Sequence, residues 1–163
     1  MRVSRQYTDP AMRVLVVINP FSGASRRLPV PARVALATRV LQASGHEPDV
    51  RVTTGPDDAR RWTQEAVAAG VDRVVAWGGD GTVNAVASAL VGSQTTLAIV
   101  RAGSGNGLAR ELGVPADAES ALQMAAGPVT RVIDVARLNG HWFVNVAGVG
   151  FDAEVAHGIA KPG

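Results

Sequence analysis

Apolar and polar residues alternate along the chain in blocks that predict strands and helices in turn. Short apolar runs, beginning with RVLVVI at 13–18, have the length and the β-branched residues of buried strands. Longer segments follow in which apolar residues recur every three or four positions, as on one helical face. The predicted strands are 13–18, 49–54, 72–77 and 96–102, and the predicted helices are 31–44, a segment from Asp57 or Asp58 to Ala69, 82–91, 105–113 and 117–127.

This alternation over 13–127 predicts an α/β fold with three layers, α/β/α, around a mainly parallel sheet. The last third of the chain has a different pattern. Segments 130–138 and 141–150 flank Asn139-Gly140, which predicts a β-hairpin with a two-residue turn. We therefore expect three parts: a disordered tail at 1–12, an α/β lobe at 13–128, and the start of a β-rich lobe at 129–163.

Composition narrows the class of protein. The chain has 163 residues, of which 47% are hydrophobic, and this is typical of a globular domain. The net charge is +2 and the arginines are scattered, so no nucleic-acid groove is indicated. No apolar run approaches the length of about 18 residues that suggests a membrane span. The absence of cysteine excludes disulfides and thiolate chemistry and fits a reducing cytosol.

Glycines and small polar residues gather directly after four predicted strands. The carboxyl ends of parallel strands share one edge of a sheet, where ligands of such folds collect. We therefore expect one site to be built from several of these loops. They are NPFSG at 19–23, TTGPDDA at 53–59, GGDGT at 78–82 and AGSGNG at 102–107.

The GGDGT loop has the residues of an anion site. Gly78 and Gly79 allow another backbone or a ligand to come close. Gly81 and Thr82 then open a helix, whose free N–H groups favour a phosphate. Asp80 beside phosphates would be repulsive without a divalent cation, so oxygen ligation of Mg²⁺, direct or through water, is expected. The alternative is a glycine-rich turn that Asp80 and Thr82 merely cap.

The other loops add weaker signals. Ser104 is a candidate phosphate ligand, and Asn106 is a candidate to orient its loop or a substrate hydroxyl. Asn19 places an amide at a strand end, with Ser22 and Gly23 able to face a nucleotide. Each of these residues is also an ordinary cap or turn residue.

Three competing motifs are absent. A Walker A loop needs Gly-Lys-Ser/Thr, and the only lysine is Lys161, which precedes a proline. The dinucleotide fingerprint is missing after the first strand. The esterase motif around Ser104 fails because Ala102 occupies its first glycine position.

Taken in order, NPFSG, VTTGPDDA, GGDGTVN, AGSGNGLAR and NVAGVGFDAEV resemble the diacylglycerol kinase catalytic-domain family, over about residues 13–158. This family includes bacterial lipid kinases and sphingosine kinases. GGDGT alone is shared with NAD kinases, and the motifs on either side of it favour the lipid kinases.

The resemblance implies transfer of the ATP γ-phosphate to a lipid hydroxyl, with Mg²⁺. Asp80 would belong to the Mg²⁺ network, and Asn106, Asp152 and Glu154 would lie toward the lipid. The partners implied are ATP and a lipid, at a cytoplasmic location with peripheral membrane contact. The implied ATP-binding residues are Asn19, Pro20, Ser22, Gly23, Thr53, Gly78, Gly79, Asp80, Gly81, Thr82, Asn84, Ser104 and Asn106.

The chain departs from the family pattern at Ala85, where a glutamate is frequent, and at Gly107, where an aspartate is frequent. The resemblance also places the general base and most of the lipid pocket in a second lobe, beyond residue 163. We therefore expect little activity from this chain alone, and homodimer formation through unpaired strands at its β-rich end. Two alternatives stay open: a NAD-kinase-like enzyme, and a non-catalytic module that binds nucleotide or associates with another protein.

Overall fold

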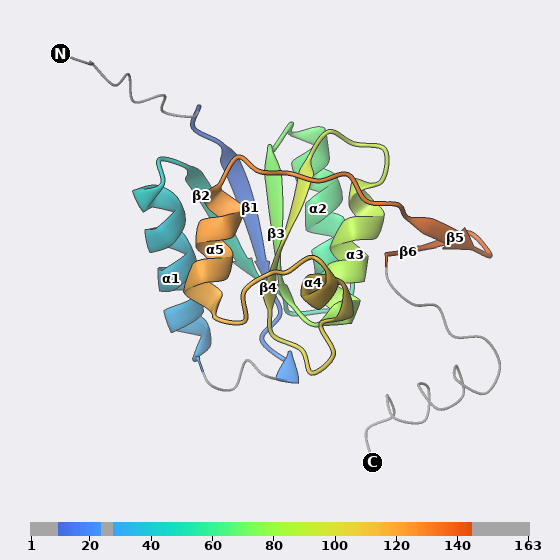
Figure 1. Cartoon of the computed structure of the whole chain (residues 1–163), viewed down its shortest axis with the longest axis horizontal. Helices are drawn as coiled ribbons and strands as arrows, with labels where there is room; N and C mark the ends of the chain where they lie inside the picture. The colour runs from blue at the N-terminus through green and yellow to red at the C-terminus, as the bar shows by residue number, and fades with distance from the viewer. Residues whose placement is uncertain (1–9, 24–27, 145–163) are drawn as a thin grey trace.

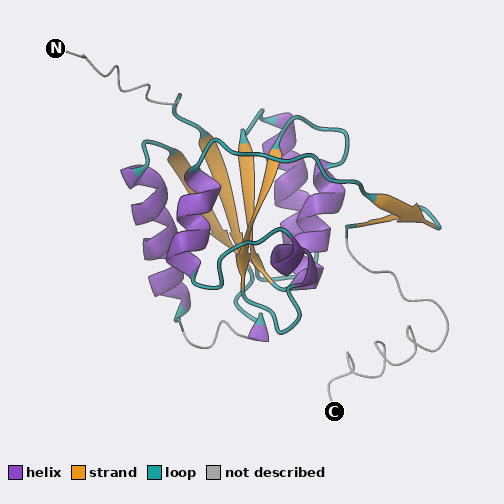
Figure 2. Ribbon diagram, in the orientation of Figure 1, coloured by secondary structure: helices purple, strands orange, loops and turns teal. Residues whose placement is uncertain are grey.

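A parallel four-stranded sheet forms the centre of the molecule (Figures 1 and 2). The computed structural model describes residues 10–23 and 28–144. All neighbouring strands of this sheet are parallel, as the alternation of strands and helices predicts. In the order β2-β1-β3-β4, the strands are β2 (Glu47–Val52), β1 (Arg13–Ile18), β3 (Arg73–Gly78) and β4 (Thr96–Arg101).

Helices cover both faces of the sheet. One face is covered by α1 (Val30–Ala43) and α5 (Ala118–Ala126), and the other by α2 (Asp58–Ala68) and α3 (Asp80–Leu90) (Figure 1). The short α4 (Gly107–Glu111) follows the end of β4. The three-layer α/β/α fold is thus confirmed.

The core lies around the two central strands. Every residue of β3 is buried, and so is every residue of β1 after Arg13. Helix side chains such as Leu41, Val86 and Leu122 pack against these strands and are fully buried themselves. Burial of each such aliphatic side chain stabilises the fold by about 1.5–3 kcal/mol.

Most element boundaries differ from the sequence prediction by one or two residues, and three of these differences lie at the edge of the sheet that carries the loops. Strand β2 ends at Val52, so Thr53 and Thr54 belong to the loop toward α2. Helix α3 begins at Asp80, two residues earlier than predicted. Helix α4 begins only at Gly107, because Asn106 has a left-handed backbone with φ of 51°.

The β-hairpin is confirmed at its turn. β5 (Ala136–Leu138) and β6 (His141–Phe143) are antiparallel, and the turn between them has positive φ at Asn139 and Gly140. A two-residue turn with two such residues matches the right-handed twist of the strands. The predicted strand over 130–138 forms only at its end, as β5: within the described residues no strand pairs with 130–135, and Val132 is 96% exposed.

Several expectations fall outside the described residues. They include the tail at 1–9, the continuation of the hairpin after residue 144, and Asp152 and Glu154. The division of the chain near residue 128 stays a prediction. Of the helices that the structure describes, none combines the length and the apolar character needed to cross a bilayer.

Candidate functional site

The loops after β1, β2, β3 and β4 emerge along one edge of the sheet, as the parallel topology requires. Backbone hydrogen bonds continue past the strand ends and align them. The Asn19 N–H donates to the Trp77 carbonyl at 2.9 Å, and the Thr53 N–H donates to the Ile18 carbonyl at 2.9 Å. The Ala102 N–H likewise donates to the Gly78 carbonyl at 3.0 Å. The predicted gathering of these loops is therefore present.

A cleft of about 400 Å³ opens between the loops after β1 and β2 and the first turns of α3. Four residues predicted to bind ATP line it, namely Asn19, Thr53, Gly81 and Thr82. The other lining residues are Phe21, Thr54, Gly55, Pro56, Ala59 and Ala85. Sequence reasoning did not single out Phe21, although its position inside NPFSG was a usable signal.

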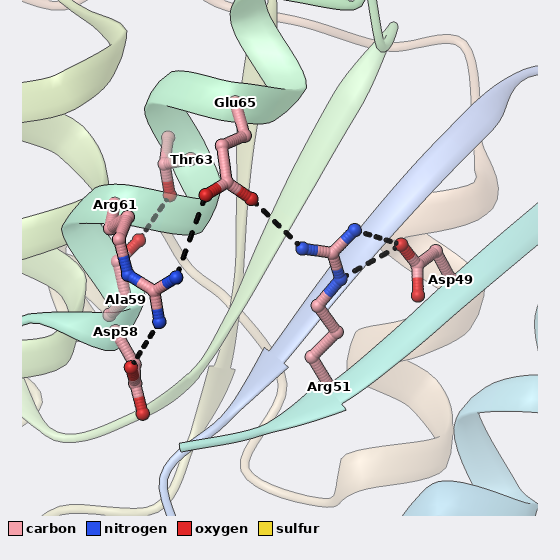
Figure 3. A network of polar contacts seen from close by, with 7 residues as sticks. All are labelled: Asp49, Arg51, Asp58, Ala59, Arg61, Thr63 and Glu65. Atoms are coloured by element: carbon pink, nitrogen blue, oxygen red, sulfur yellow. Dashed lines mark hydrogen bonds and ion pairs between the residues drawn. The ribbon is translucent and has the colours of Figure 1, made fainter. Parts of the chain in front are cut away.

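A second groove of about 450 Å³, here called the edge groove, lies over β2 and the end of α2. Three of its charged side chains are paired with one another, and the Arg13 side chain donates through Nη2 to the Ala69 carbonyl at 2.9 Å. Arg51 contacts Asp49 at 2.7 Å and Glu65 at 3.3 Å (Figure 3). Because these charges already satisfy each other, the cleft is the better candidate for a ligand site.

Asn19 organises one wall of the cleft. Its side-chain amide donates to the Thr82 hydroxyl at 3.0 Å, and its side-chain oxygen accepts from the Phe21 N–H at 2.9 Å. Below it, the buried Arg33 donates through Nη1 to the Asn19 carbonyl at 3.3 Å. Desolvation lowers the pKa of Arg33 from its ordinary value. In the sequence Arg33 looks like a surface residue of a helix, so its position under this loop was not predicted.

Asp58 organises the opposite wall. Its carboxylate accepts from the Thr54 N–H at 2.8 Å, the Gly55 N–H at 2.9 Å and the Thr54 hydroxyl at 3.0 Å. Arg61 contacts the same carboxylate at 2.7 Å (Figure 3). The Thr54 N–H, followed by Arg61, holds the pKa of Asp58 well below its usual range. Either Asp57 or Asp58 was expected to cap this helix, but Asp57 in the cap position makes no capping hydrogen bond, and Asp58, the first helical residue, reaches back into the loop.

Most glycines of the GGDGT and AGSGNG loops are required by packing within the protein. A Cβ added to Gly78 would lie 2.4 Å from the Thr82 hydroxyl oxygen. A Cβ added to Gly103 would lie 2.6 Å from the Cα of Gly79, because the two loops touch through their backbones. At Gly81 an added Cβ would meet no protein atom within 4 Å. Of Gly78, Gly81 and Gly103, Gly81 is the one that leaves room for a ligand.

Asp80 lies at the start of α3, outside the lining of the cleft. It is exposed, and its two carboxylate oxygens accept from the Asn106 and Gly107 N–H groups, each at 2.8 Å. No group of three or more His, Cys, Asp or Glu residues that could hold a metal occurs in the described part of the chain. A metal bound at this position would therefore have one carboxylate, that of Asp80, as its acidic ligand, and this carboxylate already accepts two hydrogen bonds.

The remaining residues predicted to bind ATP do not line the cleft. The Asn106 side chain bonds back to Gly103, and Ser104 is exposed. The Asn84 amide donates to the Trp142 carbonyl at 3.4 Å, so it holds the hairpin against α3. In the first loop, Pro20 is half-buried, Ser22 is buried and Gly23 is exposed, and none of them lines the cleft.

The family model for the diacylglycerol kinase catalytic domain matches residues 13–138, which include the whole sheet and the cleft. The chain belongs to this family. The resemblance seen in the sequence is confirmed, and of the two enzyme families that share GGDGT, the match favours the lipid kinases.

Named relatives agree with this assignment. A probable lipid kinase YegS-like protein of Chromohalobacter salexigens is 37% identical over 86% of this chain and 46% of its own length. A diacylglycerol kinase of Bacillus subtilis is 32% identical over 90% of this chain and 48% of its own length. The crystal structure of a diacylglycerol kinase from Bacillus anthracis matches with a TM-score of 0.71 and 29% identity, over 81% of this chain and 48% of that one. The chain thus spans about half the length of these relatives.

Proposed function

We propose that this chain binds ATP in the cleft and forms the nucleotide-binding part of a lipid kinase that phosphorylates a lipid hydroxyl. The observation that carries the proposal is the position of the cleft, which lies against the N-terminal turn of α3 and is lined by residues of three family motifs. Its volume of about 400 Å³ suits a small-molecule ligand.

The phosphate end of the ligand would lie at Gly81 and Thr82. The first N–H groups of a helix have no partners within it, and the helix dipole makes them attractive to an anion. The open space at Gly81 allows a phosphate to approach this backbone closely. The Thr82 hydroxyl accepts from Asn19, so its own proton stays available for a phosphate oxygen. The buried charge of Arg33 adds positive potential beneath the first loop.

The nucleoside end would lie between Phe21 and the loop after β2. Phe21 lines the cleft and is 83% exposed, so its ring is free to stack on a base. Thr53 lines the other side, and the Thr54 hydroxyl, which donates to Asp58, keeps its oxygen as an acceptor there. Ala85, where many family members have a glutamate, leaves this part of the cleft without an acidic side chain.

Mg²⁺ would neutralise phosphate charge in the proposed reaction. Asp80 is the carboxylate at this edge that fits such a role, and it fits through water. Each of its oxygens already accepts a backbone hydrogen bond, while its exposure leaves the remaining lone pairs open to solvent. We propose no direct coordination by this residue.

The remaining assignments stay proposals. Pro20, Ser22, Gly23, Asn84 and Ser104 would support or border the ATP site from the same loops and from α3. Asn106, Asp152 and Glu154 would lie toward the lipid acceptor. A protein that transfers the γ-phosphate of ATP to a lipid hydroxyl and releases ADP would work in the cytoplasm at a membrane surface, and self-association through the hairpin stays a prediction.

Filling the cleft tests the proposal. Ala85→Leu places a larger side chain in the cleft, and Ala69→Leu makes the same change in the edge groove. Calorimetry with ATP and Mg²⁺ is expected to show binding to the wild type and to Ala69→Leu, with at least a roughly ten-fold loss for Ala85→Leu because overpacking closes the site. Equal affinity of the two variants would contradict the proposed site.

A further inference from the structure

Asp80 links α3 to the loop before α4. Its Oδ1 accepts from the Gly107 N–H and its Oδ2 from the Asn106 N–H, both at 2.8 Å. We propose that Asp80 is a positioning residue, whose two hydrogen bonds, here called the Asp80 clamp, hold the AGSGNG loop against the start of α3 without a metal ion. Its effect on ligand binding rests on the proposed function, whereas the clamp itself does not.

The two hydrogen bonds of the clamp belong to a class that is stronger than hydrogen bonds between neutral groups. Both hydrogen bonds are charge-assisted, and they go to consecutive N–H groups at the beginning of α4, where a carboxylate is favoured by the free N–H groups. Asn106 adopts a left-handed backbone, which costs free energy for a residue other than glycine. This conformation turns the two N–H groups toward Asp80, and the Asn106 side chain secures it by accepting from the Gly103 N–H at 2.9 Å.

The glycines around Asp80 match this arrangement. A Cβ at Gly105 would lie 2.6 Å from Oδ2 of Asp80, so a side chain there would displace the carboxylate. A Cβ at Gly103 would collide with Gly79, directly before Asp80. Two glycines of the AGSGNG loop are therefore explained by its contact with the start of α3.

The clamp acts on the proposed ATP site through the backbone. Asp80 is the first residue of α3, and the next two residues, Gly81 and Thr82, line the cleft. Fixing Asp80 to the neighbouring loop therefore fixes the helix turn that would hold the phosphates. A water-mediated metal contact could coexist with this role, but the clamp does not depend on it.

Two variants break the clamp in different ways. Asp80→Asn turns an amide toward the two N–H groups and removes the charge. Gly105→Ala keeps the carboxylate and pushes it aside, and the φ of Gly105 lies outside the left-handed range that alanine rarely adopts. Glu111→Gln, at an exposed acid of α4, is the control for loss of a negative charge.

The first readout is amide hydrogen exchange of the ligand-free chain in EDTA. We expect exchange at Asn106 and Gly107 to become roughly ten-fold faster in Asp80→Asn and Gly105→Ala, because loss of a hydrogen bond to a charged group favours local opening. Glu111→Gln is expected to exchange like the wild type. Unchanged exchange at both amides in the two clamp variants would overturn the proposal. If Asp80→Asn does not fold, Gly105→Ala decides the test.

The second readout is ADP affinity, measured in EDTA and again with Mg²⁺. A positioning role predicts that both clamp variants lose affinity in EDTA as well as with Mg²⁺, and a larger loss with Mg²⁺ than in EDTA would report a water-mediated metal contact in addition to the clamp. A loss confined to Asp80→Asn with Mg²⁺ would assign the residue to the metal and overturn the proposal. If the wild type binds no ADP in either buffer, the proposed function fails, and amide exchange alone decides on the clamp.

Discussion

The side-chain amide of Asn19 donates to the hydroxyl of Thr82 at 3.0 Å, joining the end of β1 to the first turn of α3. The same side chain accepts from the N–H of Phe21 at 2.9 Å. One residue thereby sets the spacing between two walls of the cleft. This relationship makes Asn19 a structural part of the site, whether or not it touches the ligand.

Removal of the Asn19 side chain should weaken both the fold and the site. Asn19→Ala loses two hydrogen bonds at the base of the cleft, which should lower the free energy of unfolding by about 1–2 kcal/mol. ATP affinity should fall as well, because the Thr82 hydroxyl loses its fixed orientation. Urea unfolding and calorimetry measure the two effects. Asn19→Asp, which retains the acceptor for the Phe21 N–H, should be intermediate in stability, but its negative charge beside Thr82 should lower ATP affinity at least as much. Wild-type values for Asn19→Ala would refute the role.

A substitution at Gly81 distinguishes a role of this glycine in protein packing from a role in ligand binding. An added Cβ meets no protein atom within 4 Å, so Gly81→Ala should leave stability unchanged within about 0.5 kcal/mol. If a phosphate lies against this turn, the same methyl group should lower ATP affinity several-fold. Gly127→Ala, at the C-terminal end of α5, is the matched control, since its φ of −76° suits alanine. Wild-type affinity in Gly81→Ala would place the phosphates elsewhere.

Phe21 should contribute to binding of the base and not of the phosphates. Stacking on an aromatic side chain is worth about 1–3 kcal/mol per base, so Phe21→Ala should weaken ADP binding roughly ten-fold. Inorganic tripolyphosphate, which has no base, should bind the wild type and the variant equally. Phe21→Trp should restore ADP affinity. Equal losses for both ligands would mean that the substitution disturbs the loop and that the ring does not stack.

The sequence predicted the sheet and the edge that carries the site, because these depend on local patterns. The apolar run of β3 and the glycines after it are visible without any knowledge of the tertiary structure. The turn at Asn139 and Gly140 was likewise predictable, since its residue types match its backbone conformation. The absence of the strand expected over 130–135 could not be predicted from the sequence, because an extended segment becomes a strand only where a partner lies beside it.

The role of each site residue depended on contacts that the sequence does not show. Gly78 and Gly79 were expected to let another backbone or a ligand come close. Gly79 lies against the backbone of Gly103, and Gly78 lies against the Thr82 side chain, so contacts within the protein account for both glycines. Asp80 was expected in a metal network, and its hydrogen bonds to residues 26 and 27 positions later give it a second role. Neighbours so far apart in the chain cannot be read from motif spacing.

Lowering the pH should destabilise the loop after β2, which forms one wall of the cleft, because Asp58 becomes protonated. Hydrogen bonds from the Thr54 N–H, the Arg61 side chain and the Gly55 N–H lower the pKa of Asp58 in the folded state. In the unfolded chain an aspartate has a pKa of about 3.9, so the unfolded state takes up the proton first. The contribution of Asp58 to stability is therefore complete above about pH 5 and is lost as the pH falls below about 4.

Urea unfolding of the wild type and Asp58→Asn between pH 7 and pH 3 measures this contribution. The variant should be less stable at pH 7, because its amide cannot accept the same set of hydrogen bonds, and the two stability curves should converge as the pH falls. Asp117, whose pKa is lowered by the Ser120 N–H, adds a decline in the same direction, so the difference between the two proteins isolates Asp58. Asp57→Asn, one residue away and without a capping hydrogen bond, should keep wild-type stability at pH 7. A constant difference between the wild type and Asp58→Asn down to pH 3 would show that the carboxylate charge does not hold this loop.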